Sequence, residues 1–144
     1  MSQEHTYEVG IKWKEGRVGE LSSPVLNEII ECATPPEFPN GVPGVWSPEH
    51  LFVAAINSCF MATFLAISHN FKMEVASFDC KTTAKLQMVN GRYLITQAEM
   101  YPEVTLANPD TDGEKALRVL EKAKNGCLVT NSMKTEVLMH PSVN

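Results

Sequence analysis

Four cysteines, at positions 32, 59, 80 and 127, are the residues of this sequence best suited to carry chemistry. No two of them form a Cys-x-x-Cys pair, and the two closest, Cys59 and Cys80, are 21 positions apart, so a local zinc site is not predicted. The histidines lack the spacing of metal-binding motifs, and no phosphate-binding loop, dinucleotide-binding or serine-hydrolase motif is present. Thiol chemistry is therefore the class to test.

The surroundings of the four cysteines differ. Cys80 lies on the apolar face of an alternating strand pattern and Cys32 ends a weaker one, so packing explains both. Cys59 lies in an apolar helix beside an Asn-Ser pair, and Cys127 follows a predicted helix in a polar turn. Taken alone, each of these two can be core filler or a reactive thiol. A disulfide couple between them is allowed by the sequence but not required by it.

The elements that must position these cysteines follow from periodicity and turn signals. Alternation predicts strands at 6–13, 18–21 and 26–32, then at 76–88 and 92–106 around an Asn90-Gly91 hairpin turn, with a last strand at 134–139. Residues 33–46 hold four prolines and predict a long loop. Ser47 and Pro48 are typical of a helix start, and a second helix is predicted over 111–125, ended by a left-handed cap at Gly126.

The first predicted helix is apolar on every side from Leu51 to Ile67. A helix of this kind is expected to be buried on every side. A chain of 144 residues has little material with which to surround it. We therefore expect an obligate oligomer, most simply a two-fold homodimer of α+β chains.

Composition and the apolar segments exclude further classes of function. Acidic residues outnumber basic ones by 17 to 12, and without a basic cluster the chain lacks the positive face that nucleic acid binding requires. The first residues lack the charged and apolar segments of a secretory signal. The apolar run 51–67 is shorter than the roughly 20 residues of a membrane span and contains Asn57, Ser58 and Thr63. We expect one cytoplasmic domain over residues 1–144, with no nucleic acid and no membrane among its partners.

Two segments resemble the two cysteine motifs of the OsmC/Ohr family (osmotically inducible and organic hydroperoxide resistance proteins). The first is SPEHL at 47–51 with AAINSCF at 54–60, and the second is GCLVTNSMKTEV at 126–137. The order of the motifs, their spacing and the intervening hairpin and helix also fit, so the resemblance covers nearly the whole chain. The chain departs from the family pattern at Leu128, where relatives often have proline.

This resemblance implies a thiol-dependent peroxidase that reduces organic hydroperoxides to alcohols. It implies an OsmC-like α+β fold, with antiparallel sheets around a long buried central helix in an intertwined homodimer. Cys59 would be the peroxidatic thiol and Cys127 the resolving thiol, joined in a disulfide after oxidation. An external dithiol or a lipoylated protein would supply electrons, with no cofactor and no metal. The alternative from another class is a non-catalytic dimer of the same fold that binds a small apolar ligand.

The family also uses an arginine and a glutamate to hold the thiolate, and these match Arg17 and Glu49. Burial in an apolar helix raises the pKa of a thiol, so a fixed cation such as Arg17, paired with Glu49, would have to compensate. Glu49 and Cys59 are ten residues apart, which is roughly 15 Å along a straight helix. We therefore expect each active site to be shared, with at least one polar partner of Cys59 supplied by the other subunit.

Overall fold

The structure is a computed structural model that describes residues 3–144. The chain divides into two compact units, Met1–Phe52 and Val53–Asn144, and the boundary falls inside the long helix α1 (Pro48–Asn70). Each unit has its own β-sheet. The fold is α+β, as the sequence predicts.

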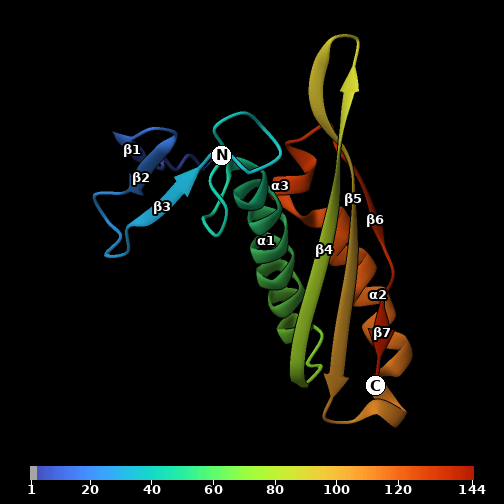
Figure 1. Cartoon of the computed structure of the whole chain (residues 1–144). Helices are drawn as coiled ribbons and strands as arrows, with labels where there is room; N and C mark the ends of the chain where they lie inside the picture. Colours follow the sequence, from blue (N-terminus) through green and yellow to red (C-terminus); the bar gives the residue numbers. More distant parts are fainter. Residues whose placement is uncertain (1–2) are drawn as a thin grey trace. The chain divides into compact units, whose positions relative to one another are not determined.

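The first unit is a three-stranded antiparallel sheet in the order β1-β2-β3 (Figure 1). Its strands are β1 (Gly10–Glu15), β2 (Val18–Ser22) and β3 (Ile30–Ala33). Gly16 takes φ +52° in the β1–β2 turn, a conformation that favours glycine, and Trp13 Nε1–H donates to its carbonyl at 3.0 Å. The predicted meander is confirmed, although its first and third strands begin four residues later than the sequence pattern indicates.

The apolar side chains of the first predicted strand are exposed. Tyr7, Val9, Ile11 and Trp13 are 87%, 66%, 67% and 74% exposed. Their alternation predicts a buried face, and for the single chain this prediction is wrong because the chain itself does not cover them. Burial of apolar surface is worth about 25 cal/mol per Å², so an exposed stripe of this kind is typical of an interaction surface.

The proline-rich loop is held at both ends by backbone hydrogen bonds. Ala33 N–H donates to the Trp46 carbonyl at 2.8 Å, and Val42 N–H donates to Thr34 at 2.9 Å. Gly41 has no room for a side chain, since a Cβ there would lie 1.9 Å from the Pro35 carbonyl oxygen. These contacts hold the loop that leads into α1 in a defined conformation.

Helix α1 begins as predicted, with Ser47 as its cap. The Ser47 hydroxyl accepts from His50 N–H at 3.1 Å, and the serine is fully buried. Only one stripe of the helix is buried, formed by Ile56, Phe60, Phe64 and Ser68. Burial on every side is therefore not achieved within one chain, and Met61 and Leu65 are each 42% exposed.

Among residues 3–144, α1 is the one helix long and apolar enough to cross a membrane by length and composition. Its buried stripe, however, packs on the second unit's sheet. Phe78 lies against Phe60 and Phe64, with ring centroids 6.0 and 5.2 Å apart. This packing is that of a core helix in an α+β protein.

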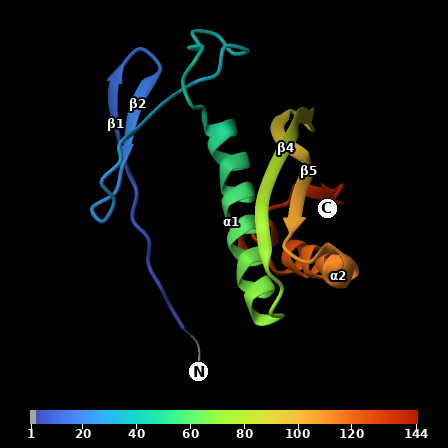
Figure 2. The ribbon, with the colours of Figure 1, turned by 90° about the horizontal axis from the view of Figure 1, so that it is seen from below.

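The second unit is built on a long β-hairpin. β4 (Val75–Val89) pairs antiparallel with β5 (Arg92–Leu106), and Asn90 and Gly91 form the turn with φ +51° and +79°. β6 (Glu136–Met139) and β7 (Ser142–Val143) both run parallel to β5, so this sheet is mixed. Alternate residues of β5 from Ala98 to Leu106 are buried. Helices α1 and α2 run beside the hairpin (Figures 1 and 2).

Helix α2 (Pro109–Gly126) buries Ala116, Val119, Leu120 and Ala123, and the one-turn helix α3 (Leu128–Asn131) follows almost at once. The predicted left-handed cap at Gly126 is wrong, because the positive-φ glycines of the described residues are 16, 44 and 91. Cys127 instead takes an extended conformation (φ −71°, ψ 114°) and joins the two helices. The polar turn predicted around Cys127 continues into helix α3.

Candidate active site

Cys59 and Cys127 lie side by side in the second unit although 68 residues separate them in the sequence. Their side chains are hydrogen-bonded to each other, and both are free thiols. Cys127 is fully buried, whereas Cys59 is partly exposed. The structure thus brings together the two cysteines that the sequence motifs single out.

Cys59 is presented by the middle of α1, and Thr63 lies one helical turn further along the same face. The Cys59 Sγ and the Thr63 Oγ1 are 3.9 Å apart. The methyl group of Thr63 is the neighbour of Gly126, since a Cβ at Gly126 would lie 3.9 Å from it. Thr63 therefore lies next to Cys59 and near the end of α2.

Cys127 is fixed by the junction of α2 and α3. Its carbonyl accepts from the Asn131 N–H at 3.0 Å and from the Thr130 hydroxyl at 3.2 Å. The side-chain amide of Asn131 also donates to the Asn125 carbonyl at 3.1 Å, which ties α3 back to α2. The residue consequently has little freedom to leave its buried position.

The two thiols have different acidities. Partial burial raises the pKa of Cys59, but hydrogen bonds from the Val129 backbone, the Cys127 thiol, Thr63 and the Leu128 backbone together outweigh it, so the pKa lies below that of an ordinary cysteine. Burial raises the pKa of Cys127, and the neighbouring Cys59 raises it further. Cys59 is therefore the thiol that more readily becomes the nucleophilic thiolate.

A polar contact anchors α1 to the hairpin two residues before Cys59. The Thr82 hydroxyl on β4 donates to the side-chain carbonyl of Asn57 at 2.5 Å. Asn57 and Thr82 are both partly buried. The contact explains why a polar residue lies in this apolar helix, and it fixes the rotation of α1 on which the direction of Cys59 depends.

Glu49 and Arg17 are not joined to each other within the chain. Glu49 Oε1 is buried, and it is the one buried side-chain nitrogen or oxygen atom in the described part of the chain that has no hydrogen-bond partner. Arg17 is exposed on the β1–β2 hairpin, and among residues 3–144 it makes no ion pair. Burying a carboxylate oxygen without a hydrogen bond costs free energy. Glu49 Oε1 therefore lacks a hydrogen-bond donor, which another molecule could supply.

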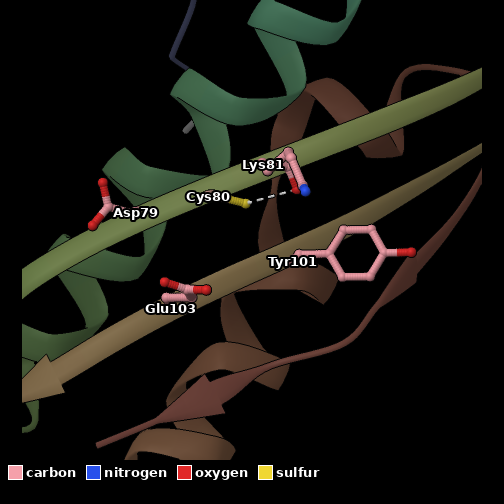
Figure 3. Close-up of a pocket in the computed structure, with 5 residues that line it drawn as sticks. All are labelled: Asp79, Cys80, Lys81, Tyr101 and Glu103. Atoms are coloured by element: carbon pink, nitrogen blue, oxygen red, sulfur yellow. Dashed lines mark hydrogen bonds between the residues drawn. The ribbon is translucent and has the colours of Figure 1, made fainter.

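The other two cysteines show no sign of reactivity. Cys32 is buried in β3. Cys80 lies on β4 and lines a pocket together with Asp79, Lys81, Tyr101 and Glu103 (Figure 3). The Lys81 ammonium lies 5.9 Å from the Tyr101 ring centre. Burial raises the pKa of Cys80, which disfavours its thiolate. No cluster of three or more His, Cys, Asp or Glu residues that could hold a metal occurs among the residues described.

Sequence reasoning missed three groups of the site. The backbone N–H groups of Leu128 and Val129 act on Cys59 only because α3 folds beside α1, which no local pattern reveals. Thr82 likewise meets Asn57 through tertiary packing. Thr63 could have been found, because residues four apart on a helix share a face.

A known protein family matches most of the chain. The profile of the OsmC-like protein family matches residues 41–140. No curated protein sequence matches the chain.

Three solved structures share the fold over almost all of both chains. An OsmC-like protein of unknown function from Vibrio cholerae superposes with TM-score 0.85 at 22% identity, covering 96% of this chain and 99% of that one. An organic hydroperoxide resistance protein from Elizabethkingia anophelis gives 0.81 at 21%, covering all of both chains. An organic hydroperoxide resistance protein OsmC from Legionella pneumophila gives 0.77 at 19%, covering 99% of each. The profile match spans well over half of the sequence and includes both cysteine motifs, and the chain therefore belongs to the OsmC-like protein family.

Proposed function

We propose that this protein is a cysteine-based peroxidase that reduces organic hydroperoxides to alcohols. The observation that carries the proposal is the pairing of a partly exposed thiol of lowered pKa, Cys59, with a buried thiol of raised pKa, Cys127. A reaction of this type needs one reactive thiol that the peroxide can reach and a second thiol beside it. Solved relatives that carry the name organic hydroperoxide resistance protein support the choice of substrate class.

The proposed peroxidase reaction has three steps. The Cys59 thiolate attacks the outer peroxide oxygen, the O–O bond breaks, and the alcohol leaves after taking a proton, so that Cys59 becomes a sulfenic acid. The Cys127 thiol then displaces water from this sulfenic acid and forms the Cys59–Cys127 disulfide. An external dithiol, free or carried as a lipoyl group on a protein, reduces the disulfide and is itself oxidised. The chain needs no cofactor for these steps.

Arg17 and Glu49 complete the proposed site. The guanidinium group stays charged and can bind a carboxylate through two hydrogen bonds while it faces a thiolate. The buried, unpartnered Glu49 Oε1 and the exposed, unpaired Arg17 each lack the partner that this role would provide. We assign Glu49 to holding the arginine, and Arg17 to stabilising the Cys59 thiolate.

The active protein is proposed to be a homodimer in the cytoplasm. The incompletely buried apolar helix α1 and the exposed apolar side chains of residues 7–13 are surfaces that a second copy would cover. Four free cysteines suit a reducing compartment.

The experiment is turnover of cumene hydroperoxide with dithiothreitol as the reductant. Cys59→Ser should abolish turnover, whereas Cys127→Ser should react once and then stall or over-oxidise. Cys32→Ala and Cys80→Ala are the matched controls and should stay close to wild type. A protein that only binds an apolar ligand would consume no peroxide beyond its own thiols, and full activity in Cys59→Ser would refute the assignment.

A further inference from the structure

The two cysteines of the proposed disulfide are unequally exposed in this structure, in which both are free thiols. Cys127 is fully buried, and any additional subunit can only cover it further. Cys59 is partly exposed, and it must be reachable in the active protein because the peroxide reacts there. A reductant can therefore reach the Cys59 sulfur without a change in the fold, but it cannot reach the Cys127 sulfur in this way.

The surroundings of Cys127 prevent it from turning outward. It lies between α2 and α3 with no loop residues on either side. Its carbonyl accepts two hydrogen bonds from Asn131 and Thr130, and the Asn131 side chain ties α3 to the end of α2. To expose the Cys127 sulfur, the junction of the two helices would have to open.

Two effects compete in deciding which sulfur an attacking thiolate chooses. The leaving thiol of lower pKa leaves faster, which favours attack on Cys127 with Cys59 as the leaving group. Thiol–disulfide exchange, however, also requires access to the attacked sulfur, and this favours Cys59. Access should outweigh the leaving-group effect. Attack on Cys127 would require local unfolding before every reaction, and the free energy of that unfolding adds to the barrier.

Building on the proposed peroxidase function, we propose that the reducing dithiol attacks the disulfide at Cys59 and that Cys127 is the leaving thiol. The first reductant thiolate forms a mixed disulfide with the Cys59 sulfur as the Cys59–Cys127 bond breaks, and Cys127 leaves as a thiolate that takes up a proton. The second reductant thiol then attacks the reductant's own sulfur. The reductant departs as a disulfide, and the Cys59 thiolate is released for the next peroxide.

The direction of attack can be read from the intermediate. The protein is oxidised with cumene hydroperoxide until its intact mass shows the loss of two hydrogen atoms in every molecule, which marks the disulfide. It is then treated briefly with a limiting amount of 2-mercaptoethanol, which has no second thiol to release Cys59 within the same molecule, and is quenched with acid and alkylated. Peptide mass spectrometry should find mercaptoethanol on Cys59 and the alkyl group on Cys127.

A second measurement isolates access from leaving-group chemistry. Cys127→Ser and Cys59→Ser, each in a background of Cys32→Ala and Cys80→Ala, are converted to the mixed disulfide with thionitrobenzoate, so that the leaving group is the same. Dithiothreitol should release it from Cys59 at least about tenfold faster than from Cys127, and urea should abolish the difference.

The outcomes separate the two proposals. Mercaptoethanol found on Cys127, or equal release rates in the folded variants, would overturn the direction of attack while leaving the peroxidase function intact. Failure to form the disulfide with peroxide would overturn the proposed function, and the direction of attack with it.

Discussion

Cys59 and Cys127 are hydrogen-bonded to each other, and this contact moves their pKa values in opposite directions. The Cys127 thiol acts as donor to the Cys59 sulfur and lowers the pKa of Cys59, whereas the nearby Cys59 raises the pKa of Cys127. In the proposed peroxidase reaction, this difference would make Cys59 the nucleophile and keep Cys127 protonated until a sulfenic acid forms on Cys59. The contact would also place Cys127 beside that sulfenic acid.

The first prediction concerns the order in which the two thiols ionise. Alkylation by iodoacetamide follows the thiolate fraction, which rises as pH passes through the pKa. The Cys59 rate should therefore reach its plateau at a pH below that of an ordinary cysteine, whereas Cys127, buried and of raised pKa, should react more slowly and only at higher pH. In Cys127→Ala, which loses a donor to Cys59, the Cys59 profile should move to higher pH. Peptide mass spectrometry would contradict the assignment if Cys127 reacted at the lower pH.

The second prediction uses the residue after Cys127. The Leu128 N–H is one of the groups that lower the pKa of Cys59, and proline, which relatives often have there, carries no N–H. Leu128→Pro should be tolerated, since position 128 is the first residue of α3 and Cys127 is already extended. The Cys59 profile should move to higher pH and its reaction at neutral pH should slow.

Leu128→Ala is the matched control for this change, because it removes the exposed side chain but keeps the N–H. Its Cys59 pH profile should overlay that of wild type. Equal shifts in the two variants would show that the Leu128 side chain, and not its backbone N–H, affects the thiol.

The parts of the fold that the sequence predicts are those with local signals. Ser47 with Pro48, and Asn90 with Gly91, fix the start of α1 and the turn of the long hairpin through backbone chemistry within a few residues. The prediction for Gly126 is wrong because a glycine after a helix usually forms a left-handed cap. Here Gly126 is the last residue of α2, and the extended Cys127 joins α2 to α3. The parallel pairing of β6 with β5 depends on long-range packing and leaves no local pattern.

The candidate site also has parts that the sequence predicts and parts that it does not. Cys59 and Cys127 lie within recognisable motifs, so the sequence alone identifies them as candidates. The two backbone donors that lower the pKa of Cys59 come from α3, and Thr82 comes from β4, so these contacts depend on how distant segments meet.

The third prediction concerns the hydrogen bond from Thr82 to Asn57. Thr82→Val preserves the shape of the side chain but leaves the partly buried Asn57 carbonyl without its donor. The free energy of unfolding should fall by about 1–2 kcal/mol, measured by urea denaturation. Because α1 also loses its anchor next to Cys59, turnover should fall as well.

Thr96→Val is the matched control for Thr82→Val. The Thr96 hydroxyl donates to the Gln87 side chain in the same way, but on an exposed part of the hairpin. It should cost no more than about 0.5 kcal/mol of unfolding free energy and leave turnover unchanged. If the two variants were equally destabilised, the contact between α1 and β4 would have no special role.

The last prediction concerns the sharing of each active site between subunits. Glu49 lies ten residues before Cys59 on α1, roughly 15 Å along the helix, and its buried Oε1 has no partner in the chain described. If Glu49 acts on the Cys59 of the other subunit, a heterodimer of Cys59→Ser and Glu49→Ala has one site with both lesions and one intact site. Co-expressed, separately tagged subunits purified as the heterodimer should regain up to half of wild-type activity per dimer, while each homodimer variant stays inactive. The same should hold for Arg17→Ala paired with Cys59→Ser if the arginine also crosses. If each site is built within one chain, both sites of every heterodimer remain damaged, and an inactive heterodimer in both pairings would refute the shared site.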